Sequence, residues 1–282
     1  MKNKPLYEKK RIQEFDRIGE AVNYLQRKPN PVDRPASETG SHRWTGSRDM
    51  KHALELLEVG WPEGLVEMKG MVENIERVLL DRIPRPTVHR DLSGSDVDIG
   101  AYLSGEPENM LEWQAQPANS EGIKLVVNGS ASAGVSARVI KARGAVVVAT
   151  IHAMQMLEIP VELWGVWASS RDRYHSETRI QISRPGYELD IERVAFILAH
   201  PSMLRRIAFG IWEREEPKDW RKRIGIEPDT GYGRPTDSNF AGENGIYLGR
   251  MGSWEEHWLD THTAVEWILA RLHDFGVELE AA

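Results

Sequence analysis

Three consecutive stretches decide the fold of this chain: residues 123–132 (IKLVVNGSAS), residues 135–157 and residues 161–168 (VELWGVWA). The first is a short apolar run that ends in small polar residues, which predicts a strand followed by a loop. The second is long and rich in apolar residues, which favours a buried helix, and the third is another short apolar run. A strand, a helix and a strand at this spacing predict a βαβ unit, with parallel strands joined by a right-handed crossover.

The segments that follow extend this unit into an α/β sheet flanked by helices. We expect an edge strand at residues 178–183 (TRIQIS), further strands at 207–213 (IAFGIWE) and 246–251 (IYLGRM), and helices at 189–199 and 263–275. Residues 214–244 are polar and rich in Gly, Pro and Asp, which predicts a long loop of the kind that is often functional. Residues 119–282 are therefore expected to form the main α/β domain.

Residues 1–118 are expected to form a helical section that packs on the main domain. Apolar residues at helical spacing, from Phe15 to Leu25, predict a helix over residues 7–28. Residues 28–46 concentrate Pro, Ser, Asn and Gly, which predicts a surface loop.

Two further helices are expected in this section. Ser47 is placed to cap the first of them, which Gly60 ends. The second runs from residue 62 or 63 to residue 80, and the prolines that follow prevent its continuation.

The composition limits the class of protein. The chain of 282 residues has 36 Lys and Arg against 43 Asp and Glu, a net charge of −7 and no cysteine. The lack of cysteine excludes a disulfide scaffold, a thiolate zinc site and a cysteine nucleophile. No stretch approaches the length of a membrane-spanning helix, and the charged N-terminus lacks an apolar signal region. We therefore expect a cytoplasmic protein with no membrane partner, and the acidic total argues against a general nucleic-acid binder.

The residues most informative about function are Asn128, Ser130 and Ser132, where the first predicted strand ends. Ligands of open α/β sheets bind outside the carboxyl ends of the strands, and a helix N-terminus there offers unpaired N–H groups. One amide oxygen and two hydroxyls in a single turn are oxygen ligands of the kind that Mg²⁺ accepts. The alternative is a tight turn that only caps the next helix.

Residues 120–280 resemble the von Willebrand factor A (vWA) fold, whose metal-ion-dependent adhesion site begins with D-x-S-x-S at this place. The resemblance includes the long helix and apolar strand that follow, and a short antiparallel edge strand in the third position, which TRIQIS would supply. The family's leading Asp is Asn128 here, so the resemblance implies a Mg²⁺ site that is weakened or lost. Residues that could complete such a site are Ser169, Ser170, Asp172, Asp229, Thr230, Thr236 and Asp237.

From about residue 40 onward the chain also resembles a family of bacteriophage proteins. The segments that carry this resemblance are residues 44–47 (WTGS), 60–64 (GWPEG), 97–107 (VDIGAYLSGEP) and 128–132 (NGSAS). It implies a vWA-like fold with an N-terminal helical addition, in the cytoplasm of a host cell, and it brings no established activity.

A competing motif is Gly94-Ser95-Asp96-Val97-Asp98. Two carboxylates one residue apart on a strand point to the same side and can share two Mg²⁺ ions, as nucleotidyltransferases require. That family also places a Gly-Ser pair further upstream, and residues 83–85 (IPR) offer none. A nucleotidyltransferase that uses Asp96 and Asp98 is therefore an alternative to a polar turn. No serine-hydrolase or P-loop motif occurs.

A basic cluster surrounds an indole in residues 218–223 (KDWRKR), and residues 1–34 add nine Lys and Arg against five acids. Positive side chains beside an aromatic ring are what a phosphate backbone and a stacked base require. Nucleic-acid binding is therefore a second alternative; the other possibility is a solvated loop with its Trp packed on the domain. The residues concerned are Lys218, Trp220, Arg221, Lys222 and Arg223.

The sequence favours a non-enzymatic protein-interaction module that binds a protein partner at the top of a vWA-like sheet, with no cofactor or with weakly bound Mg²⁺. No residue is assigned a catalytic role. The expected binding surface consists of Asn128, Ser130, Ser132, Ser169, Ser170, Asp172 and Asp237.

Overall fold

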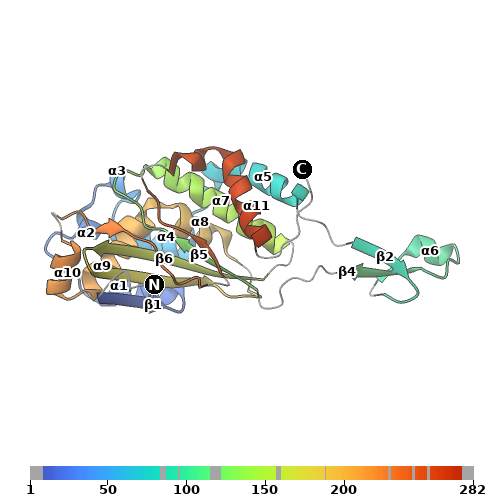
Figure 1. The fold of residues 1–282 in the computed structure, drawn as a ribbon, viewed down its shortest axis with the longest axis horizontal. Coiled ribbons are helices and arrows are strands. Elements are labelled where there is room, and N and C mark those ends of the chain that lie inside the picture. Colours follow the sequence, from blue (N-terminus) through green and yellow to red (C-terminus); the bar gives the residue numbers. More distant parts are fainter. Residues whose placement is uncertain are drawn as a thin grey trace, which may run out of the picture.

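The computed structural model describes residues 9–82, 87–94, 96–114, 122–156, 160–187, 189–227, 230–242, 245–252 and 255–274. These residues form a six-stranded sheet flanked by helices and a separate three-stranded sheet (Figure 1). The predicted α/β class, with a central, mostly parallel sheet, is confirmed. The main sheet has the order β1 (Lys9–Phe15), β7 (Tyr174–Ser183), β6 (Val161–Arg171), β5 (Ile123–Asn128) and β9 (Gly245–Leu248), and β8 (Arg234–Pro235) also pairs with β6.

The predicted βαβ unit is present. β5 pairs in parallel with β6, and α7 (Ala137–Met156) connects the two strands. Because side chains alternate along a strand, Leu125 and Val127 pack into the main core, whereas Val126 packs on the opposite face beside Phe240. One face of β5 is therefore covered by helices and the other by the chain around residue 240.

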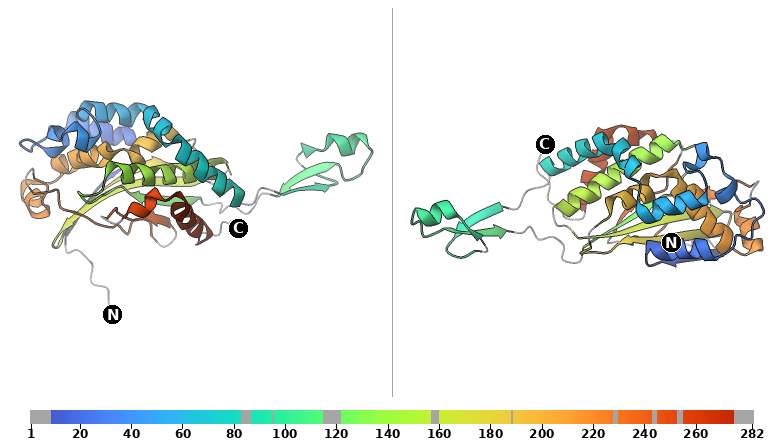
Figure 2. Two further views of the ribbon diagram at one scale, coloured as in Figure 1. Left: turned by 90° about the horizontal axis from the view of Figure 1, so that it is seen from above. Right: turned by 180° about the vertical axis from the view of Figure 1, so that it is seen from behind.

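The longer helices form layers over one face of the sheet (Figure 2). α5 and α8 pack on α7, α4 packs on α8, and α11 contacts both α5 and α7. Among the described residues no single helix has the length and apolar character to cross a membrane; α8 joined to residues 203–215 meets that test only as a pair bent by 71°. The bounds are α1 (Ile18–Arg27), α4 (Met50–Val59), α5 (Pro62–Arg82), α8 (Ile191–Ala199) and α11 (Thr261–Asp274).

Shorter helices connect these layers. Two of them, α2 and α3, lie in the loop predicted at residues 28–46, and α10 lies in the loop predicted at residues 214–244, so neither segment is irregular throughout. Their bounds are α2 (Ala36–Thr39), α3 (His42–Thr45), the π-helix η1 (Met203–Ala208), α9 (Phe209–Glu215), α10 (Lys218–Ile224) and the 3₁₀ helix η2 (Glu255–Leu259).

The N-terminal segment begins as a strand, so the prediction of a helix is wrong for residues 9–15. β1 pairs in parallel with β7 and joins the main sheet, and the helix starts only at Ile18. The strand (KKRIQEF) is charged and lies at the sheet edge, where charged side chains discourage pairing with other chains. β7 is antiparallel to β6 as predicted, but it is not an edge strand, since β1 lies outside it.

Residues 207–213 are not the predicted strand. They belong to η1 and α9, and Ile207, Ile211 and Trp212 are all buried. A short apolar run that is covered on every side has the same composition in a helix as in a central strand, so periodicity cannot separate the two.

Ser47 was predicted to cap α4, and this prediction is wrong. The helix begins at Met50, and Asp49 is its cap, because its carboxylate accepts the N–H of His52 at 2.7 Å. Gly60 ends the helix as expected, with a positive φ of 104°.

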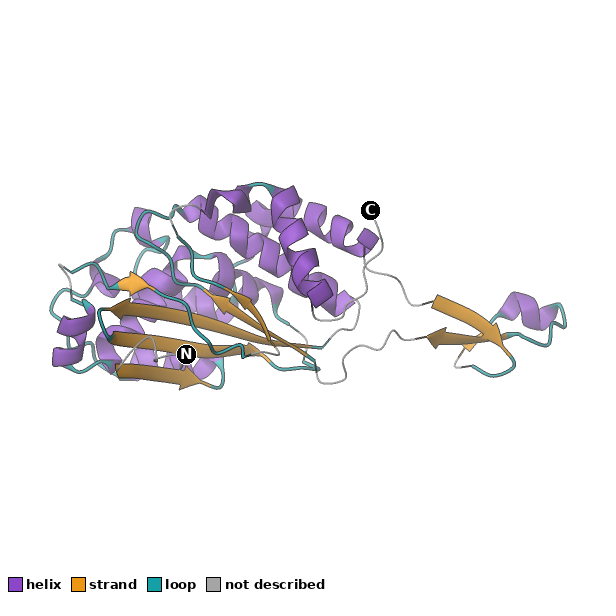
Figure 3. Cartoon of the chain, in the orientation of Figure 1, coloured by secondary structure: helices purple, strands orange, loops and turns teal. Residues whose placement is uncertain are grey.

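The second sheet consists of β2 (Thr87–Asp91), β4 (Met110–Gln114) and β3 (Asp96–Val97), with α6 (Ile99–Leu103) beside it (Figure 3). Leu92 and Ile99 are each 69% exposed and Leu103 is 78% exposed. Residues 1–118 thus contribute a strand to the main sheet and a small sheet of their own, in addition to the helices expected there.

Candidate functional site

A cavity of about 290 Å³ lies at the carboxyl ends of β5 and β6. Its polar lining includes Ser130, Ser132 and Ser169, three of the residues that the sequence placed at this edge, and Trp44 and Phe209 contribute aromatic walls. Ligands of open α/β sheets bind at this position, and the volume suits a small molecule or a single side chain. The cavity is therefore the candidate binding site.

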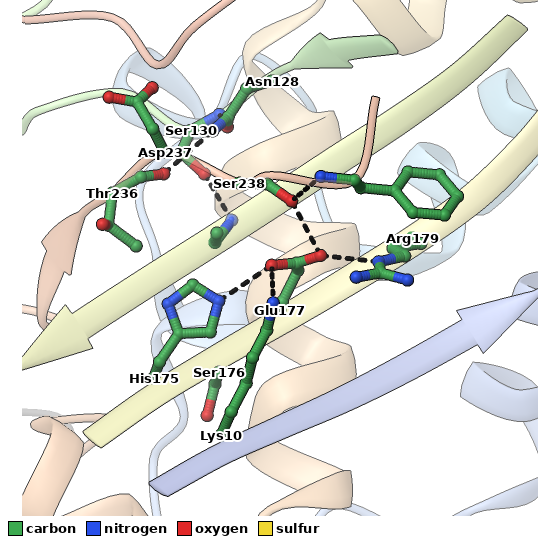
Figure 4. A network of polar contacts seen from close by, with 12 residues as sticks. Lys10, Asn128, Ser130, His175, Ser176, Glu177, Arg179, Thr236, Asp237 and Ser238 are labelled. Carbon is green, nitrogen blue, oxygen red and sulfur yellow. Dashed lines mark hydrogen bonds and ion pairs between the residues drawn. The ribbon is translucent and has the colours of Figure 1, made fainter. Parts of the chain in front are cut away.

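Asn128 is fully buried at the end of β5 (Figure 4). Its Nδ2 donates to the backbone oxygen of Thr236 and to the hydroxyl of Tyr247, both at 2.9 Å. Its Oδ1 accepts the N–H of Ser130 at 2.9 Å. The amide therefore holds the turn after β5 against the chain around residue 236.

Hydroxyl groups fix the walls of the cavity to β6. The hydroxyl of Ser130 accepts the N–H of Ala168 at 2.6 Å, and the hydroxyl of Ser169 donates to the backbone oxygen of Tyr232 at 2.9 Å. Ser132 is half-buried, and its N–H donates to the backbone oxygen of Met251 at 3.0 Å. The structure thus brings Ser130, Ser132 and Ser169 together, as predicted, and much of their hydrogen bonding is to backbone groups.

These contacts do not fit a Mg²⁺ site of the kind that the vWA resemblance implies. The oxygens of Asn128 and Ser130 already accept N–H groups, and Asn128 brings no negative charge where the vWA family has Asp. Asp237 is exposed, accepts the N–H of Arg250 at 2.9 Å and forms an ion pair with the guanidinium of the same residue. Within the described ranges, no cluster of three or more His, Asp or Glu side chains is arranged to hold a metal ion. Mg²⁺ prefers several hard oxygen ligands with charge, which this turn does not supply.

Of the other residues suggested for this edge, those that the structure describes do not line the cavity. Ser170 is half-buried on β6, opposite Arg234 of β8. Asp172 is exposed in the turn between β6 and β7, where its φ is 53°. Thr230 bonds to the backbone oxygen of Gly225, and Asp229 lies outside the described residues.

Replacing Asn128 with Asp is expected to destabilise the protein by about 2–4 kcal/mol. The carboxylate would face the carbonyl oxygen of Thr236 inside a buried site, with no proton to share. We expect no recovery when Mg²⁺ is added, measured as the melting temperature with and without the ion. Asn109→Asp is the matched control, because its amide makes one bond, to the backbone oxygen of Glu106, in a more exposed position. A Mg²⁺-dependent recovery of Asn128→Asp would establish a metal site here.

Sequence reasoning missed two polar residues that line the cavity, Arg205 of η1 and Trp212 of α9. Arg205 is 5% exposed, and it donates to the backbone oxygens of Trp44 at 2.6 Å and Val135 at 3.1 Å. Burial lowers the pKa of its guanidinium. The signal that could have found them is an arginine pair inside an otherwise apolar segment, which the mistaken strand over residues 207–213 concealed.

Arg206, the neighbour of Arg205, shapes the wall of the cavity from behind. It is fully buried, and its guanidinium donates to the hydroxyl of Ser47 and to five backbone oxygens between residues 37 and 48. A π-helix such as η1 offsets successive side chains from their α-helical positions, and such turns are frequent at functional sites. The two arginines therefore fix the loop that supplies Trp44.

Beside the turn at Asn128, a buried network surrounds Glu177 of β7 (Figure 4). Its carboxylate contacts His175 Nε2 at 2.8 Å, Arg179 Nε at 2.6 Å and Lys10 Nζ of β1 at 3.2 Å. Ser238 completes the group by donating its hydroxyl at 2.9 Å. The network joins β1, β7 and the chain that follows Thr236.

The basic cluster of α10 does not present its indole to solvent. Trp220 is half-buried, donates its N–H to the hydroxyl of Ser176 at 2.9 Å, and packs edge-on against Tyr174. Arg221 is buried and donates to the backbone oxygen of Glu216. The exposed cations are Lys218, Lys222 and Arg223. Nucleic-acid binding stays a prediction, without the stacking surface on which it depended.

Asp96 and Asp98 lie in the second sheet. Asp98 caps α6 by accepting the N–H of Ala101 at 3.1 Å, and it pairs with Arg90. These two interactions lower the pKa of Asp98. Asp96 is exposed on β3, and neither carboxylate lines the cavity. The nucleotidyltransferase alternative stays a prediction, and the contacts of Asp98 are those of a helix cap.

The arrangement is that of an α/β protein with a small cavity at the carboxyl edge of its sheet, lined by hydroxyls, aromatic rings and one buried arginine. Residues 2–276 match the family described as "Domain of unknown function (DUF7192)", and the chain belongs to this family. No curated protein and no solved structure matches it.

Proposed function

We propose that this protein is a non-enzymatic interaction module that binds a protein partner at the carboxyl edge of its sheet, without a requirement for Mg²⁺. The observation that carries the proposal is the cavity formed by the turn after β5 and the end of β6, at Ser130, Ser132 and Ser169. Its position is the one at which proteins of this architecture bind ligands.

The bonding of the hydroxyls supports a binding role over a catalytic one. A nucleophilic serine requires a histidine, lysine or carboxylate base within hydrogen-bond reach. The hydroxyls of Ser130 and Ser169 instead bond to backbone groups of Ala168 and Tyr232. The vWA resemblance supports the same role, because it implies partner binding at this edge, and the antiparallel pairing of β6 with β7 is compatible with it.

The test is a pull-down from host cells with the whole chain, comparing two alanines replaced by arginine. Ala133 is exposed at the rim of the cavity, and Ala270 is exposed on α11, outside the lining of the cavity. We expect Ala133→Arg to reduce capture of the partner by about tenfold, Ala270→Arg to leave it unchanged, and a metal chelator to have no effect. Equal capture by the two variants, or capture that needs Mg²⁺, would refute the proposal.

A further inference from the structure

The cavity contains a buried positive charge with no acidic partner. Arg205 is 5% exposed, and among the described residues no ion pair joins it to a carboxylate. Burial lowers the pKa of its guanidinium, and no acidic residue in the described part of the chain opposes that effect. Its guanidinium donates to two neutral carbonyl oxygens, which use only two of its five N–H groups, and it lies 5.1 Å from the centre of the Trp44 ring. Buried charges are normally paired, so we expect an anion to bind beside the guanidinium of Arg205.

A second donor in the same wall is unused. The indole N–H of Trp212 is buried and finds no acceptor among the described residues, although Trp212 is only 3% exposed and lines the cavity. An indole N–H that is buried usually has a hydrogen-bond partner, and leaving a donor unpaired costs about 1–3 kcal/mol. Ser130 accepts the N–H of Ala168, which leaves its own hydroxyl proton available to a ligand. An acceptor supplied from outside would satisfy these groups.

The aromatic side chains of the cavity indicate what kind of molecule the anionic group belongs to. Phe209 and Tyr232 stack at 4.3 Å with an angle of 14° between their rings, and Trp44 lies beside Phe209. Such walls favour a flat apolar body, since aromatic pairs prefer offset-stacked or edge-on contacts. A single guanidinium balances one negative charge, and its planar fork matches a carboxylate.

We propose that the cavity binds a monocarboxylate carried on an aromatic ring, with the carboxylate at Arg205 and Trp212 and the ring against Phe209 and Trp44. This inference rests on the proposed binding role of the same edge and names its ligand chemistry. Two sources share that chemistry: a small free aromatic acid and the terminal carboxylate of a partner protein that ends in an aromatic residue.

The test uses calorimetry on the whole protein with three probes: phenylacetate, its neutral counterpart phenylacetamide, and inorganic phosphate. We expect phenylacetate to bind at least about tenfold more tightly than either of the others, which corresponds to the loss of one charge-assisted contact. A peptide that ends in Phe with a free carboxylate, compared with phenylacetate, identifies the source. Equal affinity for acid and amide, tighter binding of phosphate, or no binding of phenylacetate would overturn the inference.

Two tryptophan variants locate the site. Trp212→Phe keeps an aromatic ring and removes the five-membered part of the indole with its unpaired N–H, so phenylacetate should bind several-fold more weakly. Trp164→Phe is the control, because Trp164 is also buried but packs on the opposite face of the sheet and donates to Glu162. An equal effect of both variants would contradict the assignment. If phenylacetate fails to bind while Ala133→Arg still reduces partner capture, only the ligand chemistry is wrong. If phenylacetate binds while Ala133→Arg leaves partner capture unchanged, only the interaction module is refuted.

Discussion

Arg206→Met should lower the free energy of unfolding by about 4 kcal/mol, a larger loss than most single substitutions cause. Arg206 is fully buried and donates to the hydroxyl of Ser47 at 2.8 Å and to the backbone oxygens of Ser37, Gly40 and Ser47 at 2.8–3.1 Å, as well as to more distant oxygens of the same loop. Methionine fills a similar volume but leaves these oxygens without donors. The measurement is urea unfolding at neutral pH.

Two further variants make this test specific. Arg206→Lys keeps the charge but replaces the planar fork with a single ammonium, so most of the loss should remain. Arg17→Met removes a 79% exposed arginine that pairs with Glu20, and it should cost less than about 1 kcal/mol. Equal losses for Arg206→Met and Arg17→Met would show that the loop does not depend on the buried guanidinium.

The same arginine explains why part of the fold could not be predicted. Residues 28–46 have the composition of a surface loop, and composition does not reveal that a guanidinium almost 160 residues later in the chain binds its backbone oxygens. The βαβ unit around α7 was predictable because its apolar runs differ in length and are separated by Pro160. The local sequence pattern therefore predicts the strands and helix at the centre of the sheet. The structure of the loop at residues 28–46 depends on polar contacts with residues far away in the chain.

The candidate site likewise contains some residues that could be predicted from the sequence and others that could not. Ser130, Ser132 and Ser169 follow strand ends, and a strand end is visible in the sequence as the last apolar residue before small polar ones. Arg205 and Trp212 come from the π-helix η1 and the helix α9 that follows it, and the side chains around them are buried on all sides. The strand β1 was missed because Lys10 and its neighbours are charged, and their partner Glu177 lies on another strand.

Glu177→Gln should lower the free energy of unfolding at pH 7 by about 3 kcal/mol. The change keeps the shape of the side chain but removes a fully buried charge that balances Arg179 and Lys10, whose side chains are 13% and 32% exposed. One end of the new amide would also place a donor against Arg179 or His175, which already face the carboxylate. Glu14→Gln is the matched control, because Glu14 pairs with the same Arg179 but is 43% exposed, and it should cost less than about 1 kcal/mol.

The difference in free energy of unfolding between the wild type and Glu177→Gln should also depend on pH. The sign of that dependence follows from the pKa of Glu177. Burial alone would raise that pKa, but the bonds from His175 and Arg179 and the charges of Arg179 and Lys10 outweigh burial and lower it to about 2. The unfolded carboxyl has its ordinary pKa near 4.5, so the folded state binds the proton less readily. The stabilisation is therefore complete above the unfolded value and is lost as the pH falls from about 4.5 toward 2. Urea titrations at pH 7, 5, 4 and 3 should show the gap between the wild type and Glu177→Gln narrowing below about pH 4.5, because only the wild type loses a charge there. A gap that stays constant down to pH 3 would mean that the network does not hold the carboxylate in its charged form.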